Sequence, residues 1–173
     1  MAPALASYSA VLLSQTAVPA WHAAHPYLPF VFAGSAAASS GGLGMVLAPV
    51  CEAGPARTFA ATGAVAELVA SRVLESRLGM VGEAYASGRP HDLREWSEYL
   101  TAAGLVGTLA ARYSRAAAVA AGLALMGGSA LQRFGVFAAG VESTRDPRYV
   151  VEPQRERSAA RVPVDRGPGV TTR

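Results

Sequence analysis

The sequence contains no lysine, a single cysteine and no charged residue before Glu52. Only 16% of its 173 residues are charged, against roughly 25% in ordinary soluble domains, while 51% are hydrophobic. A soluble chain of this size needs charged faces throughout, whereas a chain dissolved in lipid needs charges only in its loops and tail. The missing charges therefore favour a membrane protein.

The single cysteine, Cys51, excludes a disulfide framework and a cysteine-ligated zinc or iron–sulfur site built by this chain alone. The sequence pI is near 9.4, but every positive side chain is an arginine. Most of these arginines lie in connecting segments and toward the C-terminus. This distribution suits loops beside anionic lipid better than a surface that follows phosphates. We therefore expect a lipid bilayer as partner and no nucleic acid.

Hydropathy and helix-breaking residues divide residues 1–141 into five candidate spans, near 5–20, 27–50, 55–78, 94–113 and 115–140. The second is uncharged throughout and long enough for a hydrocarbon core of about 30 Å, whereas the first would reach only about 24 Å. Trp96, Tyr99 and Tyr113 flank the fourth span, as interfacial aromatic residues do. The predicted fold class is all-α, a polytopic transmembrane helical bundle of about five spans.

Residues 142–173 alternate Pro, Arg and Glu without an apolar period, which predicts a polar, disordered tail. Arginines gather in this tail and around the 79–93 connection. Five spans put these two segments on one side of the membrane, and their arginines make that side cytoplasmic. We therefore expect a multi-pass protein of the cytoplasmic (inner) membrane with a cytoplasmic C-terminal tail.

Small residues recur at every fourth position of the second span, as Gly34, Ala38 and Gly42. A helix face of this kind is nearly flat and lets two helices approach closely in lipid. A compositional bias toward alanine and glycine is an alternative explanation of the same pattern.

Glu67 and Arg133 are the ionisable residues deepest in the predicted spans. Such residues are costly in lipid and usually face the bundle interior, a partner charge or a water-filled path. Both are therefore candidates for a cofactor-binding or proton-handling role. Arg133 lies near the end of its predicted span, where snorkelling to the lipid headgroups is an adequate alternative.

His22 and His25 lie three residues apart beside Trp21 and Pro26, at a predicted span boundary. Haem-binding histidines normally lie on facing helices, so this pair could bind haem or a metal only with outside ligands. We predict an interfacial turn or a contact with a partner subunit, and no metal site. The chain also lacks Walker, GxSxG, HExxH and dinucleotide motifs, so it is not expected to be catalytic alone.

Two stretches, SYSAVLLSQTAVPAWHAAHPYLPFVFAGSAAASSGGLGM at 7–45 and RFGVFAAGVESTRDPRYVVEPQRER at 133–157, resemble the second half of NrfD-type proteins, the polysulfide reductase membrane-subunit family. The intervening EAGPAR at 52–57 and the order of spans agree with this resemblance. Members of that family are helical membrane subunits that pair with a ferredoxin-like iron–sulfur subunit, often beside a molybdopterin catalytic subunit. They exchange electrons with membrane quinone.

The resemblance implies an integral membrane subunit of an oxidoreductase complex, which anchors an iron–sulfur partner and mediates electron transfer with quinone. It also implies that the chain binds no redox cofactor alone. The chain begins where family members are already halfway, so we expect a truncated protein, and no family quinone residue can be carried over. Two alternatives stay open: a structural or assembly subunit without quinone chemistry, and a small transporter with Glu67 on its substrate path. Against the transporter, no pair of broken half-helices is visible.

Overall fold

The computed structural model describes residues 2–78, 88–145 and 151, and all regular structure within them is helical. This confirms the all-α prediction for the described part of the chain. The helices are α1 (Ala2–Ser14), α2 (Pro19–Ala23), α3 (Leu28–Leu47), α4 (Gly54–Arg77), α6 (Gly88–Ala110) and α7 (Arg115–Arg145). The predicted 142–173 tail lies outside the described residues, except that α7 continues to 145 and that 151 is described.

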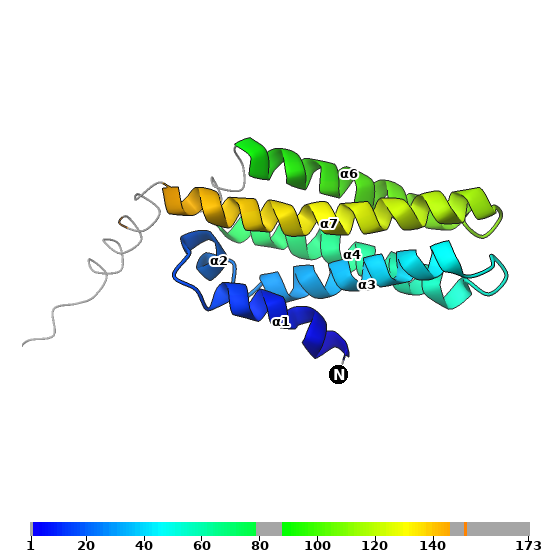
Figure 1. Cartoon of the computed structure of the whole chain (residues 1–173), viewed down its shortest axis with the longest axis horizontal. Coiled ribbons are helices and arrows are strands. Elements are labelled where there is room, and N and C mark those ends of the chain that lie inside the picture. The colour runs from blue at the N-terminus through cyan, green and yellow to red at the C-terminus, as the bar shows by residue number, and fades with distance from the viewer. Residues whose placement is uncertain (1, 79–87, 146–150, 152–173) are drawn as a thin grey trace, which may run out of the picture.

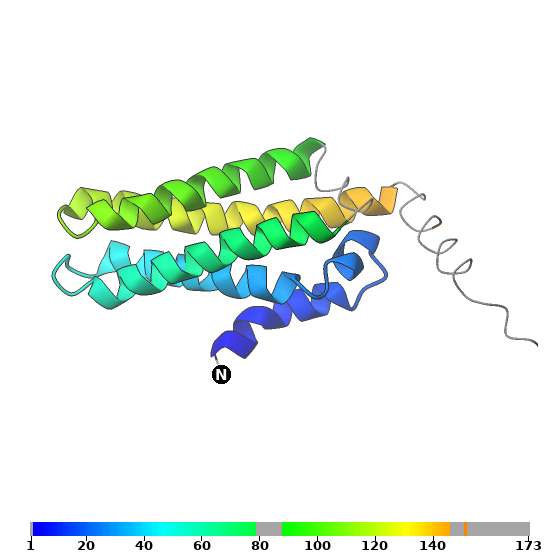
Figure 2. The same ribbon diagram turned by 180° about the vertical axis from the view of Figure 1, so that it is seen from behind.

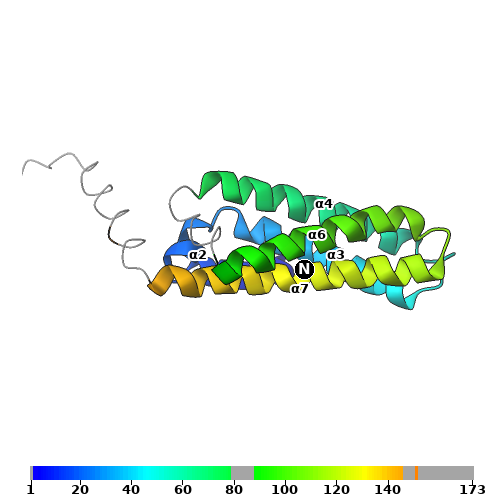
Figure 3. The same ribbon diagram turned by 90° about the horizontal axis from the view of Figure 1, so that it is seen from above.

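Four long helices, α3, α4, α6 and α7, lie side by side as an elongated bundle, each antiparallel to the next (Figures 1, 2 and 3). Helix α3 packs against α4 and α7, α6 packs against α7, and the shorter α1 packs on the outside of α3. The α3–α4 and α6–α7 connections meet at one end, which we call the Cys51 end. The opposite end of the bundle, which we call the His22 end, contains α2, the end of α4, the start of α6 and the end of α7 (Figure 1).

Prolines set where several helices begin and end. Pro19, Pro29 and Pro55 stand in the first turns of α2, α3 and α4, where a missing N–H costs no helical hydrogen bond. Val18, before Pro19, is extended at ψ 118°, because proline disfavours helical geometry in the residue preceding it. A helix therefore cannot continue through Val18 to the predicted end at residue 20, and α1 ends at Ser14.

Helices α3 and α4 approach through small residues, as the fourfold spacing in the second span predicts. A Cβ added to Gly34 would lie 2.6 Å from the backbone nitrogen of Glu67. A Cβ added to Gly41 would overlap the backbone of Ala60, and one added to Gly63 would overlap that of Ala38. The two backbones are therefore in contact, and side chains cannot be inserted between them.

The bundle carries many large apolar side chains on its outside and several polar side chains within an otherwise apolar interior. Large apolar side chains on the outside include Phe30, Leu47, Phe59, Val69, Trp96, Val106, Leu109, Leu123, Phe134 and Phe137. Polar side chains buried inside include Ser35, Glu67, Ser71, Ser97, Thr101, Ser129 and Gln132. Exposed apolar surface on this scale marks contact with a membrane or with other proteins.

By length and composition, α3 is the one described helix apolar enough to cross a membrane unaided. A single helix of this kind also occurs in the cores of soluble proteins, so the predicted five spans do not follow from it. Helices α4, α6 and α7 carry charges near their ends, and residues 58–71, 99–111 and 116–132 contain one ionisable residue between them, Glu67. These weakly charged segments are about 20 to 26 Å long, somewhat shorter than a hydrocarbon core of about 30 Å.

Candidate functional site

Five buried polar residues from three helices form a ring in the middle of the bundle: Ser35 of α3, Glu67 and Ser71 of α4, and Ser129 and Gln132 of α7. Each is at most 4% exposed. Ser35 meets Ser129 across the α3–α7 interface, and Gln132 meets Ser71 across the α7–α4 interface. Glu67 and Ser71 are four residues apart on α4, and Ser129 and Gln132 are three apart on α7, so each pair shares one helix face. We call this cluster the polar ring.

Ser35 and Ser129 of the polar ring lie within short hydrogen-bond distance of each other at two pairs of atoms. The Ser129 hydroxyl donates to the Ser35 carbonyl oxygen at 2.6 Å, and the two hydroxyl oxygens lie 2.5 Å apart. Either hydroxyl can donate in the contact between the two oxygens, so the Ser35 proton can face Ser129 or Glu67.

Glu67 is the ionisable member of the polar ring, and it is 2% exposed. Neither of its carboxyl oxygens accepts or donates a hydrogen bond of normal geometry. The Ser35 hydroxyl is its nearest polar neighbour, and the Arg133 guanidinium acts on it through space without forming an ion pair. A buried polar atom without a partner is costly, so this carboxyl requires an explanation beyond packing.

The sequence suggested that Arg133 lies near a helix end, but the structure places it well inside α7. Helix α7 continues to Arg145, so Arg133 is about 18 Å from that end at helical rise. The guanidinium carbon is 5.7 Å from the centre of the Phe32 ring, in a cation–π contact. Simple snorkelling from a helix end is therefore not the reason for its position.

A cluster of paired charges lies between α4 and α6, toward the His22 end. Arg72 bonds Glu98 at 2.8 Å, while Arg94 pairs with Glu75 and lies 3.5 Å from Glu98. Arg94 is only 8% exposed, although Arg72 is largely exposed. Opposite charges held in contact reduce the cost of placing ionisable groups near lipid.

His22 and His25 both point away from the bundle. Trp21 of α2 holds the segment that joins α1 to α3 against α7. Its Nε1 donates to the Val136 carbonyl at 2.8 Å, and its ring packs on Gly140. The two imidazoles are exposed and stack with centroids 5.8 Å apart. Each Nδ1 bonds a backbone carbonyl, that of Ser14 and that of His22 respectively. The structure thus brings the two histidines together on the surface, whereas the residues of the polar ring are buried.

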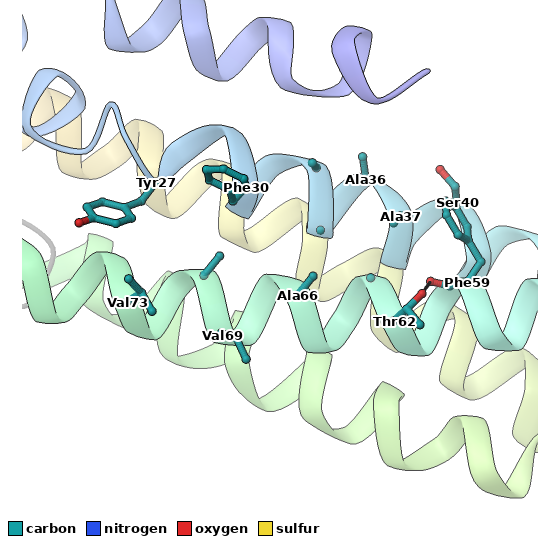
Figure 4. Close-up of a pocket in the computed structure, with 14 residues that line it drawn as sticks. Tyr27, Phe30, Ala36, Ala37, Ser40, Phe59, Thr62, Ala66, Val69 and Val73 are labelled. Atoms are coloured by element: carbon teal, nitrogen blue, oxygen red, sulfur yellow. Dashed lines mark hydrogen bonds between the residues drawn. The ribbon is translucent and has the colours of Figure 1, made fainter. Parts of the chain in front are cut away.

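An open apolar groove of about 980 Å³ runs between α3 and α4 (Figure 4). Its lining includes Phe30, Ala37, Phe59, Ala66 and Val69, with the Tyr27 side chain at the end nearest His22. The groove suits an extended apolar ligand, because its walls offer few polar groups that could orient a polar one. Glu67 does not line this groove.

No group of three or more His, Cys, Asp or Glu side chains that could hold a metal occurs in the described segments. No protein-family model, curated protein or solved structure matches the chain.

Sequence reasoning found Glu67 but missed its companions in the polar ring. Ser71 could have been found, because it follows Glu67 by four residues and therefore shares its helix face. Ser35, Ser129 and Gln132 gave no local signal, since serines and glutamines in small-residue helices are common. Only the packing of α3 and α4 on α7 brings them to Glu67.

Proposed function

We propose that this chain is an integral membrane subunit of a quinone-linked oxidoreductase complex, with α1, α3, α4, α6 and α7 as its membrane helices. The observation that carries the membrane assignment is the large number of exposed apolar side chains on the outside of the bundle, together with the polar ring inside it. In water such a surface would drive aggregation, whereas in lipid it is the solvated surface. Small residues between α3 and α4 support the same assignment, because close backbone packing drives helix association in lipid.

The redox part of the proposal is supported by the resemblance of residues 7–45 and 133–157 to NrfD-type proteins. An iron–sulfur partner would carry the electrons, and a molybdopterin catalytic subunit would lie further from the membrane.

The His22 end suits the docking of that partner. His22 and His25 are exposed there, and Trp21 fixes their backbone to α7. Arg77, Arg89 and Asp92 are exposed at the same end and offer charges of both signs. A fixed polar surface of this kind loses little conformational entropy when a partner binds.

Quinone contact is proposed for the groove between α3 and α4, which would hold the isoprenoid tail. Its Phe30 and Phe59 side chains would pack against that tail, and its open side would admit the tail from the bilayer. A bound quinone would supply the two-electron, two-proton chemistry. This chain's own contribution is to orient the tail, while head-group donors would come from a partner subunit.

Membrane fractionation followed by co-purification tests the proposal. The chain, tagged and expressed in its native host, is expected to stay in the pellet after an alkaline carbonate wash, and to co-purify with a subunit containing iron and acid-labile sulfide. Recovery in the supernatant would contradict the membrane assignment. Purification from membranes without iron would contradict the redox assignment.

Two variants sharpen this experiment. The double variant His22→Ala/His25→Ala should reduce the co-purified iron several-fold while the chain stays in the membrane. Glu52→Ala, at the Cys51 end, is the matched control and should leave the iron unchanged. The variant Glu67→Gln distinguishes the proposal from the alternative of a structural subunit. A proton role for Glu67 predicts intact assembly with lost quinone-linked activity, whereas a structural subunit predicts unchanged activity.

A further inference from the structure

A line of polar side chains leads from Glu67 along α4 to the His22 end. Ser71 and Glu75 follow Glu67 at intervals of four residues, so the three side chains share one helix face at steps of about 6 Å. Ser71 is buried and accepts a hydrogen bond from Gln132 Nε2 at 3.3 Å. The Glu75 side chain is 35% exposed and pairs with Arg94. The line therefore runs from a buried carboxyl to a group in contact with solvent.

The opposite direction along the bundle is closed by apolar packing. The buried residues that pack together there are Ala38 and Met45 of α3, Ala60 and Ala64 of α4, Ala111, and Ala118, Ala121 and Leu125 of α7. Gly63 lies one turn from Glu67 toward the Cys51 end, and the backbone of α3 occupies the space where a Gly63 side chain would be. In the described part of the chain, the polar side chains that share a helix face with Glu67 thus continue toward the His22 end, while buried apolar residues lie toward the Cys51 end.

The hydrogen-bond inventory around Glu67 suits a neutral acid better than a carboxylate. The Ser35 and Ser129 hydroxyls bond to each other, and the Gln132 amide donates to Ser71 rather than to Glu67. A carboxylate would therefore be buried without an ion pair and with the Ser35 hydroxyl as its one neighbouring donor, which is costly. A protonated acid carries no charge into this site and brings its own donor. The charged group that acts on Glu67 is Arg133 of α7, which forms no ion pair with it, and α3 carries no ionisable residue.

We propose that Glu67 is the inner end of a one-sided proton-uptake path, and that it receives its proton from water at the His22 end through Glu75 and Ser71. A proton adds to the Glu75 carboxylate from hydronium, which becomes water. The Glu75 O–H bond then breaks as its proton passes through a bridging water to the Ser71 oxygen, while the original Ser71 proton passes through a second bridging water to form the O–H bond of Glu67. No electron is transferred in these steps. The inference rests on the membrane placement of the proposed function and not on its redox partner.

Infrared spectroscopy of the purified chain in liposomes tests the end of the path. The carbonyl stretch of a protonated carboxylic acid is expected at neutral pH, and Glu67→Gln should remove it. This variant keeps the shape of the neutral acid, so its helix content and thermal stability should match the wild type. Glu52→Gln, an exposed control, should keep the band. The proposal is overturned if Glu67→Gln removes no such band, or if sodium chloride abolishes it, which would indicate a cation in place of the proton.

Exchange of the same band in deuterated water tests the route. Ser71→Ala should slow the exchange roughly tenfold or more, because a positioned hydroxyl relay is lost. Ser76→Ala is the matched control, since Ser76 is exposed on α4 and bonds only its own helix at Val73. Equal exchange rates in the two variants would overturn the route. Neither measurement uses quinone or a partner, so failure here is distinct from a failure to co-purify iron.

Discussion

At Gly41 the backbone of α3 touches the backbone of α4 with no side chain between them. A Cβ at this position would lie 2.6 Å from the Ala60 Cα and 2.7 Å from its Cβ. Backbone cannot move aside as a flexible side chain can, so Gly41→Ala must separate the two helices. We expect a loss of about 1 to 3 kcal/mol in the free energy of unfolding, the usual cost of overpacking. Titration with a denaturing detergent, followed by circular dichroism, measures it.

Gly127→Ala is the matched control for this substitution. Its Cβ would meet only the Leu100 Cδ1 at 3.4 Å, an ordinary contact. Alanine is a better helix former than glycine, by up to about 1 kcal/mol, so this variant should be as stable as the wild type or more so. If Gly41→Ala and Gly127→Ala were equally stable, the close approach of α3 and α4 would be wrong.

Single residues also show why sequence reasoning succeeded in part at the candidate site. Glu67 was found because it is the one ionisable residue in the middle of three helices. The Ser35–Ser129 pair beside it was not found, because these two serines are 94 residues apart and meet only through the packing of α3 on α7. A lone charge in an apolar run is visible in a sequence, whereas the side chains around it depend on which helices become neighbours.

At the scale of the helix, Arg115 at the start of α7 holds the end of α3. Its guanidinium donates to the carbonyl oxygens of Met45 at 3.0 Å and Ala48 at 2.7 Å, and also to that of Val46. The last carbonyls of a helix lack partners within it, so a cation here satisfies them and opposes the negative end of the helix dipole.

Removing this cap should loosen the end of α3. For Arg115→Met we expect a loss of about 1 kcal/mol, the low end for charged hydrogen bonds because two of the three are exposed. Faster hydrogen exchange should be confined to the last turn of α3. Arg112→Met is the control, because Arg112 contacts only Tyr113 in the α6–α7 connection. Unchanged exchange in Arg115→Met would show that the cap does not stabilise α3.

The helix bounds show where sequence signals were sufficient. Helices α3 and α4 lie close to their predicted ranges because Pro29, Pro49 and Pro55 mark their ends. Helix α7 extends past its predicted end at 140 because its buried face continues: Val136, Ala139, Gly140 and Ser143 are buried at helical spacing. The polar residues of this last turn suggested a tail, but Glu142 and Arg145 pair along the helix at 3.0 Å. Composition alone does not separate a polar tail from a helix with one polar face.

At the scale of the whole molecule, the distribution of charge gives the bundle two unlike ends. Arg72, Arg77, Arg89, Arg94 and Arg145 lie toward the His22 end, while Arg57, Arg112 and Arg115 lie toward the Cys51 end. The antiparallel order of the four long helices places the end of α4, the start of α6 and the end of α7 together. A membrane protein with this asymmetry would keep its more arginine-rich end in the cytoplasm.

The single cysteine allows this orientation to be measured directly. Cys51 is exposed in the connection at the Cys51 end, so a membrane-impermeant maleimide should label it in intact spheroplasts. The double variant Cys51→Ser/Asp92→Cys moves the thiol to the exposed start of α6 at the His22 end, and it should be labelled only after permeabilisation. The reverse pattern would invert the orientation and move the proposed proton uptake to the outer face. Equal labelling of both positions in sealed spheroplasts would mean that the bundle does not span the membrane, since a bilayer cannot then separate its two ends.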